Sequence, residues 1–430
     1  MREAVGSSVG NAGAVIVGAS QAGLQLATSL RALDYAAPIT LVGAEQHLPY
    51  QRPPLTKGFL ADGSDAGSLA FRAASFYAER GIRVLLGTRV ARVGLPASGG
   101  AGEAVTDTGE VLAFDALALT VGARPRRLAV PGADLDGVCY LRKLEDAVEL
   151  RRRLATADRI VVVGGGFLGL EAAAVARSAG KTVTVVEAFD RLLARSVAPE
   201  VSRFYLGTHR DRGVDVRLGS TVCELAGAAG RVSGVVLADG STLPADLVLV
   251  SVGVTPRTEL AEQVGAECDR DGLGGIVVDG SARTTVPGVV AAGDCTVQPD
   301  PLTGRGRVRL ESVHNAIMQA KVAAACLAGR TGPAPEVPWF WSDQYDLKLQ
   351  IAGLKDGYDH HVLRGDPGSG RFSVLYYRDG ALLGIDAVNR AGDYLAVRRA
   401  LGRRGTIDPV AARDPGVALK DLVRLECPRV

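Results

Sequence analysis

The sequence predicts an α/β fold with two similar parallel-sheet domains and a smaller α+β domain near the C-terminal end. Two stretches, one near the start and one in the middle of the 430 residues, each have the pattern strand, glycine-rich turn, helix, strand. A hydrophobic fraction of 47% and 54 glycines suit a protein with many tight strand-to-helix turns. A Pro- and Gly-rich segment at residues 329–338 predicts a linker before the third domain.

The middle stretch, residues 160–195, contains a complete βαβ unit. Ile160–Val163 predicts a buried parallel strand, and Leu168–Ala179 predicts an Ala-rich helix. Val183–Val186 predicts the second strand, which ends at Glu187. This is the layout of a Rossmann-like nucleotide-binding unit.

Three glycines form G-x-G-x-x-G in the turn before this helix. Gly164 permits the tight turn, Gly166 lets the backbone approach a pyrophosphate, and Gly169 lets the helix pack on the strand. Phe167 and Leu168 lie between them at the positive end of the helix dipole, where phosphates bind. The motif therefore predicts a dinucleotide site.

Glu187 follows the second strand, about 20 residues after the turn, where an acid accepts a hydrogen bond from the adenosine ribose. A 2′-phosphate would be repelled there, which favours NADH over NADPH. Arg191 and Arg195 weaken that preference slightly. The cofactor expected at the middle stretch is NADH.

The first stretch repeats this layout. Ala14–Val17 and Ile39–Val42 predict two strands, Leu24–Leu33 predicts the helix between them, and Glu45 follows the second strand. Two matched units in one chain predict two dinucleotide sites and transfer of a hydride between their cofactors. The first stretch would bind FAD and the middle stretch NADH.

The first glycine-rich turn differs from the second at one position. Gly18 and Gly23 keep the outer glycines, but Ser20 stands where the middle glycine is expected, and Gln21 and Ala22 complete the turn. Serine is small and adds a hydroxyl near the phosphates. We expect a functional but slightly altered FAD site; the alternative is a structural turn that binds no ligand.

Charge and hydropathy exclude several other classes. Basic and acidic residues number 49 and 47, so no bulk field favours nucleic acid or an acidic membrane surface. No apolar run approaches the roughly 20 residues that span a bilayer, and residues 1–11 lack the basic and apolar regions of a secretory signal. We expect a cytoplasmic protein with a disordered leader at 1–12.

Cysteine and histidine spacing predicts no metal site. The six cysteines include no C-x-x-C pair, and we expect them to be buried, reduced side chains. The adjacent His360 and His361 would point to opposite faces of a strand. The cysteines are Cys139, Cys223, Cys268, Cys295, Cys326 and Cys427.

Further motifs extend the pattern over nearly the whole chain. Together with the two turns, "ALTVGARPR" at 118–126 and "VVAAGDC" at 289–295 resemble the two-dinucleotide-binding-domain flavoproteins of the disulfide reductase superfamily. The resemblance implies a glutathione-reductase-like fold. Disulfide reductases carry a redox cysteine pair beside the flavin, but "PYQRPPLTKGFL" at 49–60 has no cysteine. An exit for electrons through thiols is therefore not expected.

Four spaced motifs resemble a narrower group. "LPYQRPPLTK" (48–57), "GLE" (169–171), "ESVHNAIMQA" (311–320) and "PWFWSDQYDLKLQIAG" (338–353) are similar to NADH-dependent ferredoxin and rubredoxin reductases of the putidaredoxin-reductase type. These enzymes feed cytochrome P450s, aromatic-ring dioxygenases and alkane hydroxylases. Flavoproteins of the apoptosis-inducing-factor type share the framework.

The resemblance implies roles for individual residues. Lys57 would lie near the flavin N5 and pair with Glu171, and Trp341 would cover the far end of the ring, so these three would be the catalytic residues. The family usually has an acid where this chain has Ala44, so the FAD ribose would rest on Glu45 alone. NADH binding would add Arg195 and Gly253 to Glu187. The FAD contacts would be Arg52, Lys57, Val90, Arg142, Asp294, Val313, His314 and Trp341.

The implied reaction passes hydride from NADH to FAD and then single electrons to a [2Fe–2S] ferredoxin that serves a cytochrome P450 or an aromatic-ring dioxygenase. Rubredoxin reductase, a signalling flavoprotein like apoptosis-inducing factor, and NADH oxidase stay open as alternatives. Ferredoxins are usually acidic, so a basic docking surface is expected. Candidates are Lys321 and the cluster Arg398, Arg399, Arg403 and Arg404, for which an ordinary solvated surface is the alternative.

The expected domain limits follow from these motifs. Residues 13–121 and 254–330 would form a discontinuous FAD-binding domain, and residues 122–253 the NAD-binding domain. Residues 331–430 would form the α+β domain at the partner interface, with a hairpin over 372–388 and a helix around 392–402. We expect a monomer or a homodimer.

Overall fold

The computed structural model describes residues 12–62, 65–96 and 101–425, which divide into two compact units. Cys427 and residues 1–11 of the expected leader thus lie outside the described residues. The first unit consists of residues up to 51, 70–123 and 256–336, and the second consists of 52–69, 124–255 and the chain from 337 onward.

The first unit is built on a five-stranded parallel sheet with the strand order β20-β7-β1-β2-β3. All four residues of β1 and all four of β7 are buried, as expected for central strands of a parallel sheet that is covered on both faces. The strands are β1 (Ala14–Val17), β2 (Ile39–Val42), β3 (Ile82–Leu85), β7 (Ala116–Leu119) and β20 (Val289–Ala291).

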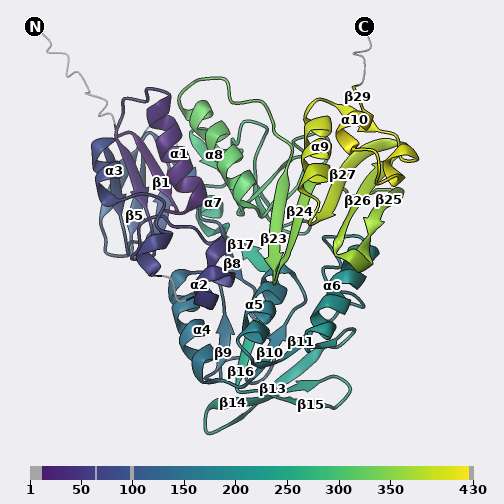
Figure 1. Ribbon diagram of the computed structural model, residues 1–430. Helices are drawn as coiled ribbons and strands as arrows, with labels where there is room; N and C mark the ends of the chain where they lie inside the picture. The colour runs from purple at the N-terminus through teal and green to yellow at the C-terminus, as the bar shows by residue number, and fades with distance from the viewer. Residues whose placement is uncertain (1–11, 63–64, 97–100, 426–430) are drawn as a thin grey trace, which may run out of the picture. The chain divides into compact units, whose positions relative to one another are not determined.

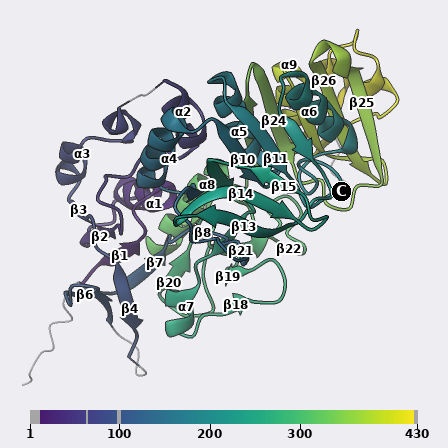
Figure 2. The ribbon, with the colours of Figure 1, turned by 90° about the horizontal axis from the view of Figure 1, so that it is seen from below.

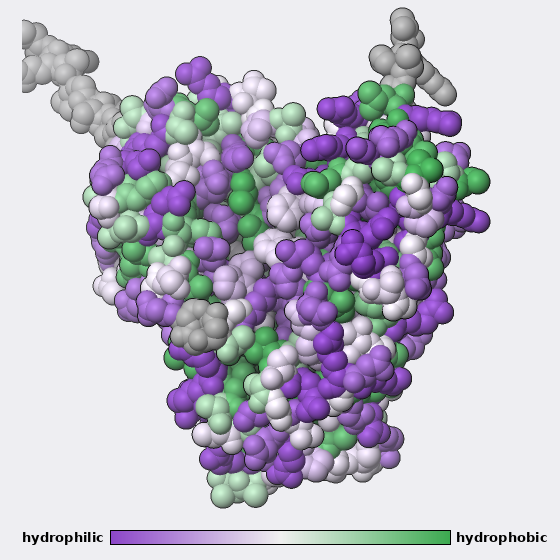
Figure 3. Space-filling view, in the orientation of Figure 1, coloured by the Kyte–Doolittle hydropathy of each residue, from purple (hydrophilic) through white to green (hydrophobic). Residues whose placement is uncertain are grey.

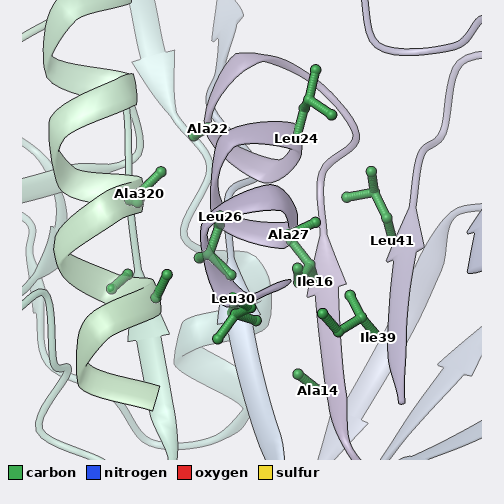
Figure 4. Close-up of a cluster of buried hydrophobic side chains, with 14 of the residues drawn as sticks. Ala14, Ile16, Ala22, Leu24, Leu26, Ala27, Leu30, Ile39, Leu41 and Ala320 are labelled. Atoms are coloured by element: carbon green, nitrogen blue, oxygen red, sulfur yellow. The ribbon is translucent and has the colours of Figure 1, made fainter. Parts of the chain in front are cut away.

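Two helices, α1 (Gln21–Ala32) and α8 (Val313–Leu327), lie side by side in this unit (Figure 1). Their contact is close because α8 presents alanines, including Ala320, toward the larger side chains of α1. Figure 4 shows Leu26 and Leu30 of α1 within this hydrophobic cluster, between Ile16 of β1 and the α8 helix. The first βα turn is held on this core.

Smaller elements complete the first unit. The antiparallel strands β4 (Val90–Gly94), β5 (Gly102–Thr106) and β6 (Val111–Phe114) form a three-stranded sheet. The others are α3 (Ala74–Glu79), α7 (Glu259–Gln263), β18 (Cys268–Asp269), β19 (Gly275–Val277), β21 (Thr296–Pro299) and β22 (Arg307–Val308).

The second unit contains another five-stranded parallel sheet, with the order β12-β11-β10-β16-β9. Figure 2 shows α5 beside β10 and β11, the three elements of the predicted βαβ unit. The elements are β9 (Val138–Tyr140), α4 (Leu144–Thr156), β10 (Arg159–Val163), α5 (Phe167–Ser178), β11 (Thr182–Val186), α6 (Pro199–Asp211), β12 (Asp215–Arg217) and β16 (Leu247–Val250). The strands β13 (Val222–Ala228), β14 (Arg231–Leu237) and β15 (Thr242–Pro244) form a separate antiparallel meander.

The C-terminal part of the second unit is an antiparallel sheet with the order β23-β24-β27-β26-β25. The expected hairpin is present as the antiparallel pair β26 and β27. Asp379 and Gly380, which both have positive φ, form the turn between these strands. In Figure 3 hydrophilic residues predominate over this part, at the upper right of the face in view. The elements are β23 (Trp339–Gln344), β24 (Leu347–Gly353), β25 (His360–Asp366), β26 (Arg371–Arg378), β27 (Ala381–Val388), α9 (Ala391–Gly402), β28 (Gly405–Ile407), α10 (Leu419–Leu422) and β29 (Val423–Leu425).

A short segment from the N-terminal third also belongs to the second unit. It contains the 3-10 helix η1 (Pro53–Thr56), α2 (Gly58–Asp62) and the 3-10 helix η2 (Ala66–Leu69). The chain crosses between units at β8 (Ala123–Pro125) and β17 (Val254–Pro256). Within the described ranges, no helix is long and apolar enough to cross a membrane.

Candidate functional site

The first glycine-rich turn connects β1 to α1 and is crowded at both ends. Gly18 has φ +117°, and a Cβ placed there would lie 2.2 Å from the Thr120 carbonyl oxygen. A Cβ on Gly23 would lie 2.0 Å from the carbonyl oxygen of Gly18. The Thr120 hydroxyl donates to that same carbonyl at 2.8 Å. Only glycine fits at either end of this turn.

The second turn, between β10 and α5, repeats this crowding. Gly164 has φ +113°, and a Cβ there would lie 2.2 Å from the Ser251 carbonyl oxygen. A Cβ on Gly169 would lie 2.2 Å from the carbonyl oxygen of Gly164. A Cβ on Gly166, by contrast, would meet no atom of the described residues within 4 Å. The middle position is therefore open space in front of a helix N-terminus.

This difference explains the unusual first turn. Ser20 occupies the position that corresponds to Gly166, and each residue is the N-cap of its helix. A side chain is sterically allowed at the open middle position, while the outer glycines are fixed by backbone carbonyls. Both turns can thus present helix N–H groups to a pyrophosphate, and each forms a cradle that fits a dinucleotide.

The acid after each second strand is held in place by hydrogen bonds. Glu187 accepts one from the Gly165 N–H at 2.6 Å and another from the Phe189 N–H at 2.9 Å. Glu45 accepts one from the Tyr50 hydroxyl at 2.5 Å. Glu187 is therefore joined directly to the glycine-rich turn that it was predicted to serve, whereas Ala44 beside Glu45 is exposed.

The two arginines near Glu187 differ in their contacts. Arg191 donates to the Val197 carbonyl and the Ser202 hydroxyl, both at 2.8 Å, so it supports the local loop. Arg195 lies near Gly253, since a Cβ on that glycine would be 3.9 Å from the Arg195 guanidinium. The structure thus brings together two of the residues predicted to bind NADH.

A buried carboxylate, Glu171 of α5, is the centre of a polar cluster in the second unit. It is 5% exposed. Lys57 donates to its Oε2 at 2.8 Å and Thr56 donates to the same oxygen at 2.6 Å. Ser342 donates to its Oε1 at 2.7 Å. The expected pairing of Lys57 with Glu171 is confirmed, and the three donors offset the cost of burying a carboxylate.

Trp341 belongs to the same neighbourhood. It follows Phe340 and precedes Ser342 in β23, and its ring centroid lies 5.9 Å from Lys57 Nζ. Arg52, five residues before Lys57, donates to the Arg142 carbonyl at 2.7 Å. The second unit therefore groups Lys57, Glu171 and Trp341, and separately joins Arg52 to Arg142; their roles toward FAD stay predictions.

The remaining predicted FAD contacts lie in the first unit. Val313 and His314 start α8, where the Ser312 hydroxyl caps the helix by accepting from a backbone N–H. His314 Nε2 lies 3.2 Å from a Glu336 carboxylate oxygen. Asp294, just after β20, is half-buried. Val90 is buried at the start of β4.

Sequence reasoning missed two members of the Glu171 cluster. Thr56 lies inside "RPPLTK", but that motif directed attention to its charged residues. Ser342 comes from the far C-terminal strand, and the period of a strand shows only that it shares a face with Gln344. Contact between Ser342 and Glu171 depends on tertiary packing, which no local pattern encodes.

Comparison with known proteins agrees with this arrangement. The family model for pyridine nucleotide-disulphide oxidoreductases matches residues 13–320, and the Reductase C-terminal model matches 339–423. The chain belongs to the pyridine nucleotide-disulphide oxidoreductase family. The α/β fold with two dinucleotide-binding domains and a C-terminal domain, predicted from the sequence, is confirmed.

Individual relatives of this oxidoreductase cover nearly its whole length. Rhodocoxin reductase of Rhodococcus erythropolis is 43% identical over 406 residues, which are 94% of this chain and 93% of that protein. Rubredoxin-NAD(+) reductase of Pseudomonas putida is 36% identical over 375 residues, 87% of this chain and 95% of that protein. The crystal structure of the ferredoxin reductase for the CYP199A2 system from Rhodopseudomonas palustris has a TM-score of 0.90 and 41% identity, covering 96% of this chain and 100% of that one. The resemblance to ferredoxin and rubredoxin reductases is confirmed.

The cysteines in the described part of this family member form no disulfide. All five within the described residues are free thiols. Burial raises the pKa of Cys139 to about 11 and that of Cys295 to about 12, so both stay protonated at neutral pH. The expectation that the cysteines are buried is wrong for Cys223, which is exposed on the meander strand β13. No group of three or more potential metal ligands occurs within the described ranges.

Proposed function

We propose that this oxidoreductase is an FAD-dependent NADH:ferredoxin reductase that passes hydride equivalents from NADH to FAD and single electrons to a [2Fe–2S] ferredoxin. The observation that carries the proposal is the pair of glycine-rich turns in one chain, each followed by an acid, while the cysteines of the described residues form no pair that could act as electron exit. The relatives named as ferredoxin reductases support this acceptor.

FAD and a pyridine nucleotide are the cofactors of this family, and bound FAD supplies conversion from two-electron to one-electron transfer. The chain's own residues bind and orient. Gly18, Ser20 and Gly23 would hold the FAD pyrophosphate, and Gly164, Gly166 and Gly169 that of NADH. Glu187 would accept from the ribose hydroxyls and disfavour a 2′-phosphate, which makes NADH the preferred donor.

Lys57 and Glu171 would set the charge close to the flavin ring. A fixed cation stabilises negative charge that develops on a reduced cofactor, and the carboxylate holds that cation in one place. Trp341 would cover the ring and limit the access of water. These roles rest on the family resemblance together with the cluster described above.

The docking surface for the ferredoxin would be basic. Arg398 lies over the Trp339 ring at 5.3 Å, and that ring is 5.5 Å from the ring of Trp341. The neighbouring Arg399, Arg403 and Arg404 are exposed. Lys321, the other candidate, is half-buried on α8. An acidic partner would be steered toward such a surface by long-range attraction that salt weakens.

The decisive experiment is stopped-flow reduction of the purified protein by NADH, with and without a [2Fe–2S] ferredoxin. Fast flavin bleaching followed by reoxidation that depends on ferredoxin is the expected result. Slow bleaching with a persistent charge-transfer band would instead indicate the signalling class, and rapid oxygen consumption without an acceptor would indicate an NADH oxidase.

Lys321→Glu tests the docking surface. We expect a several-fold rise in the KM for ferredoxin that is largest at low salt, while flavin reduction by NADH is unchanged. An identical ferredoxin titration for variant and parent would remove Lys321 from the interface and leave the arginine cluster as the candidate.

Rubredoxin reductase is the second candidate, because a rubredoxin reductase is among the full-length relatives. The same stopped-flow experiment with rubredoxin in place of ferredoxin compares the two acceptors. The faster acceptor at equal concentration identifies the partner class. The cytoplasmic location, the oligomeric state and the domain limits stay predictions.

A further inference from the structure

A continuous chain of hydrogen bonds, buried as far as His209, leads away from Glu171 within the second unit. Ser342 donates to Glu171 at 2.7 Å, and Gln344 Nε2 donates to Ser342 Oγ at 3.2 Å. Gln344 Oε1 lies 2.9 Å from His209 Nε2, and the Tyr345 hydroxyl lies 3.3 Å from His209 Nδ1. Ser342, Gln344 and His209 are each fully buried.

The direction of every bond in this chain is fixed by chemistry. An ionised carboxylate can only accept, so Ser342 gives its single proton to Glu171 and must accept from Gln344. The amide oxygen of Gln344 then faces the imidazole and needs a donor, which places the proton of His209 on Nε2. Nδ1 is left to accept from the Tyr345 hydroxyl. All donors point toward the carboxylate.

The ionisation of His209 and Tyr345, the two residues of the chain farthest from Glu171, suits this direction. Burial lowers the pKa of His209, so the imidazole is neutral at neutral pH and has one donor and one acceptor nitrogen. Burial raises the pKa of Tyr345 to about 12, so its hydroxyl keeps the proton that it donates. Arg212, 4.4 Å above the Tyr345 ring, also disfavours a positive charge on His209.

We propose that Ser342, Gln344 and His209 are positioning residues for electron transfer, which act by holding Glu171 in one orientation so that Lys57 is fixed beside the flavin. The inference deepens the proposed function and rests on it. Glu171 lies on α5, His209 on α6, and Ser342 and Gln344 on β23. Side chains from separate segments therefore fix the orientation of one carboxylate.

Strand geometry connects this chain to the predicted flavin contacts. Alternate residues of β23 point to opposite faces, so Ser342 and Gln344 share one face and Trp341 lies on the other. The hydrogen bonds of Ser342 and Gln344 therefore also fix the register of Trp341, which lies 5.9 Å from Lys57. The same strand orients both partners of the Lys57–Glu171 pair.

Other titratable groups near Glu171 are few. Lys57 faces it from the segment after η1. The buried Tyr205 of α6 is close enough to feel the negative charges of Glu171, Asp343 and Asp386. None of these belongs to the donor chain. Removal of Ser342 thus deprives Glu171 of one donor without deleting a charge.

Ser342→Ala is the main test, and Ser373→Ala is its matched control. Ser373 is also fully buried in the C-terminal sheet and donates to a different buried carboxylate, Asp393, at 3.1 Å. For Ser342→Ala we expect the limiting rate constant of flavin reduction by NADH to fall several-fold while the Kd for NADH is unchanged, because Glu171 no longer holds Lys57 in one orientation. Flavin reduction in Ser373→Ala should match that of the parent. Ser342→Thr, which keeps the hydroxyl, should restore the rate of the parent.

A second measurement does not depend on enzyme activity. Nitrogen-15 NMR of histidine-labelled protein, with the His209 signal assigned by its loss in His209→Gln, reports the tautomer. We expect a neutral ring protonated on Nε2 at neutral pH, and a changed signal in Gln344→Leu, which keeps the side-chain size.

The outcomes separate this proposal from the proposed function. Equal limiting rate constants of flavin reduction for Ser342→Ala and Ser373→Ala, or a His209 ring protonated on Nδ1, would overturn the positioning chain. Neither measurement uses ferredoxin, so failure to reduce ferredoxin would count against the proposed acceptor and leave the chain standing.

Discussion

The glycine-rich turn of the first unit and that of the second have the same backbone at their ends and a different residue in the middle. Gly18 and Gly164 both have positive φ, and a Cβ on either would clash with the carbonyl of a residue that follows a neighbouring strand. At the middle, one turn has Ser20 and the other has Gly166. The comparison teaches that backbone crowding requires the outer glycines, while the middle position of the second turn is open and can hold a side chain.

Substituting an outer glycine should have the largest effect. Gly164→Ala places a Cβ against a carbonyl oxygen, so we expect a loss of about 2–4 kcal/mol in the free energy of unfolding and loss of flavin reduction by NADH. Because the first turn is untouched, the folded fraction should keep its yellow FAD. Gly18→Ala should show the converse, a protein without colour. Thermal melting measures the stability of both variants, and the visible spectrum measures their bound flavin. A stability equal to that of the parent would show that the turn has room for a Cβ at these positions.

Removing one acid should have an intermediate effect. Glu187→Ala deletes a carboxylate that would accept from the ribose, so the KM for NADH should rise about tenfold or more, with a smaller change for NADPH. Steady-state kinetics with both nucleotides measures the ratio. Glu45→Ala is the control, since it should leave that ratio alone. An unchanged NADH/NADPH preference in Glu187→Ala would refute the ribose role.

Exchanging the middle residues should have the smallest effect on folding. Ser20→Gly and Gly166→Ser each alter a helix N-cap, where a serine–glycine exchange changes stability by only a few tenths of a kcal/mol. Ser20→Gly should alter FAD affinity only, and Gly166→Ser only the KM for NADH. Flavin titration of the apoprotein and NADH kinetics test this pairing. A large loss of stability in either variant would mean that the middle position is not open.

Local patterns predicted the elements around these turns well, because they depend on short-range physics. The strands Ala14–Val17 and Ile39–Val42 have the limits expected from their apolar runs. Helix α1 begins at Gln21 rather than at the predicted Leu24, because the turn residues after the N-cap Ser20 already have helical hydrogen bonds. The period of the apolar residues cannot show this first turn.

Contacts between distant segments were predicted only where a family resemblance supplied them. The Lys57–Glu171 pair came from matched motifs, and the structure contains it. Nothing in the sequence indicates that Ser342 and Thr56 bind the same carboxylate, or that a donor chain through His209 leads to it. Such partners are chosen by packing between elements that lie more than a hundred residues apart.

The strand order of the first sheet also determines when that sheet can be completed on the ribosome. Its edge strand β20 is Val289–Ala291, whereas its central strand β1 is Ala14–Val17. The parallel sheet of the second unit needs nothing beyond β16, which ends at Val250. During synthesis the parallel sheet of the second unit can therefore form first. The sheet of the first unit must wait for its edge strand β20, which is translated about forty residues later. This reverses the usual N-to-C order of domain folding.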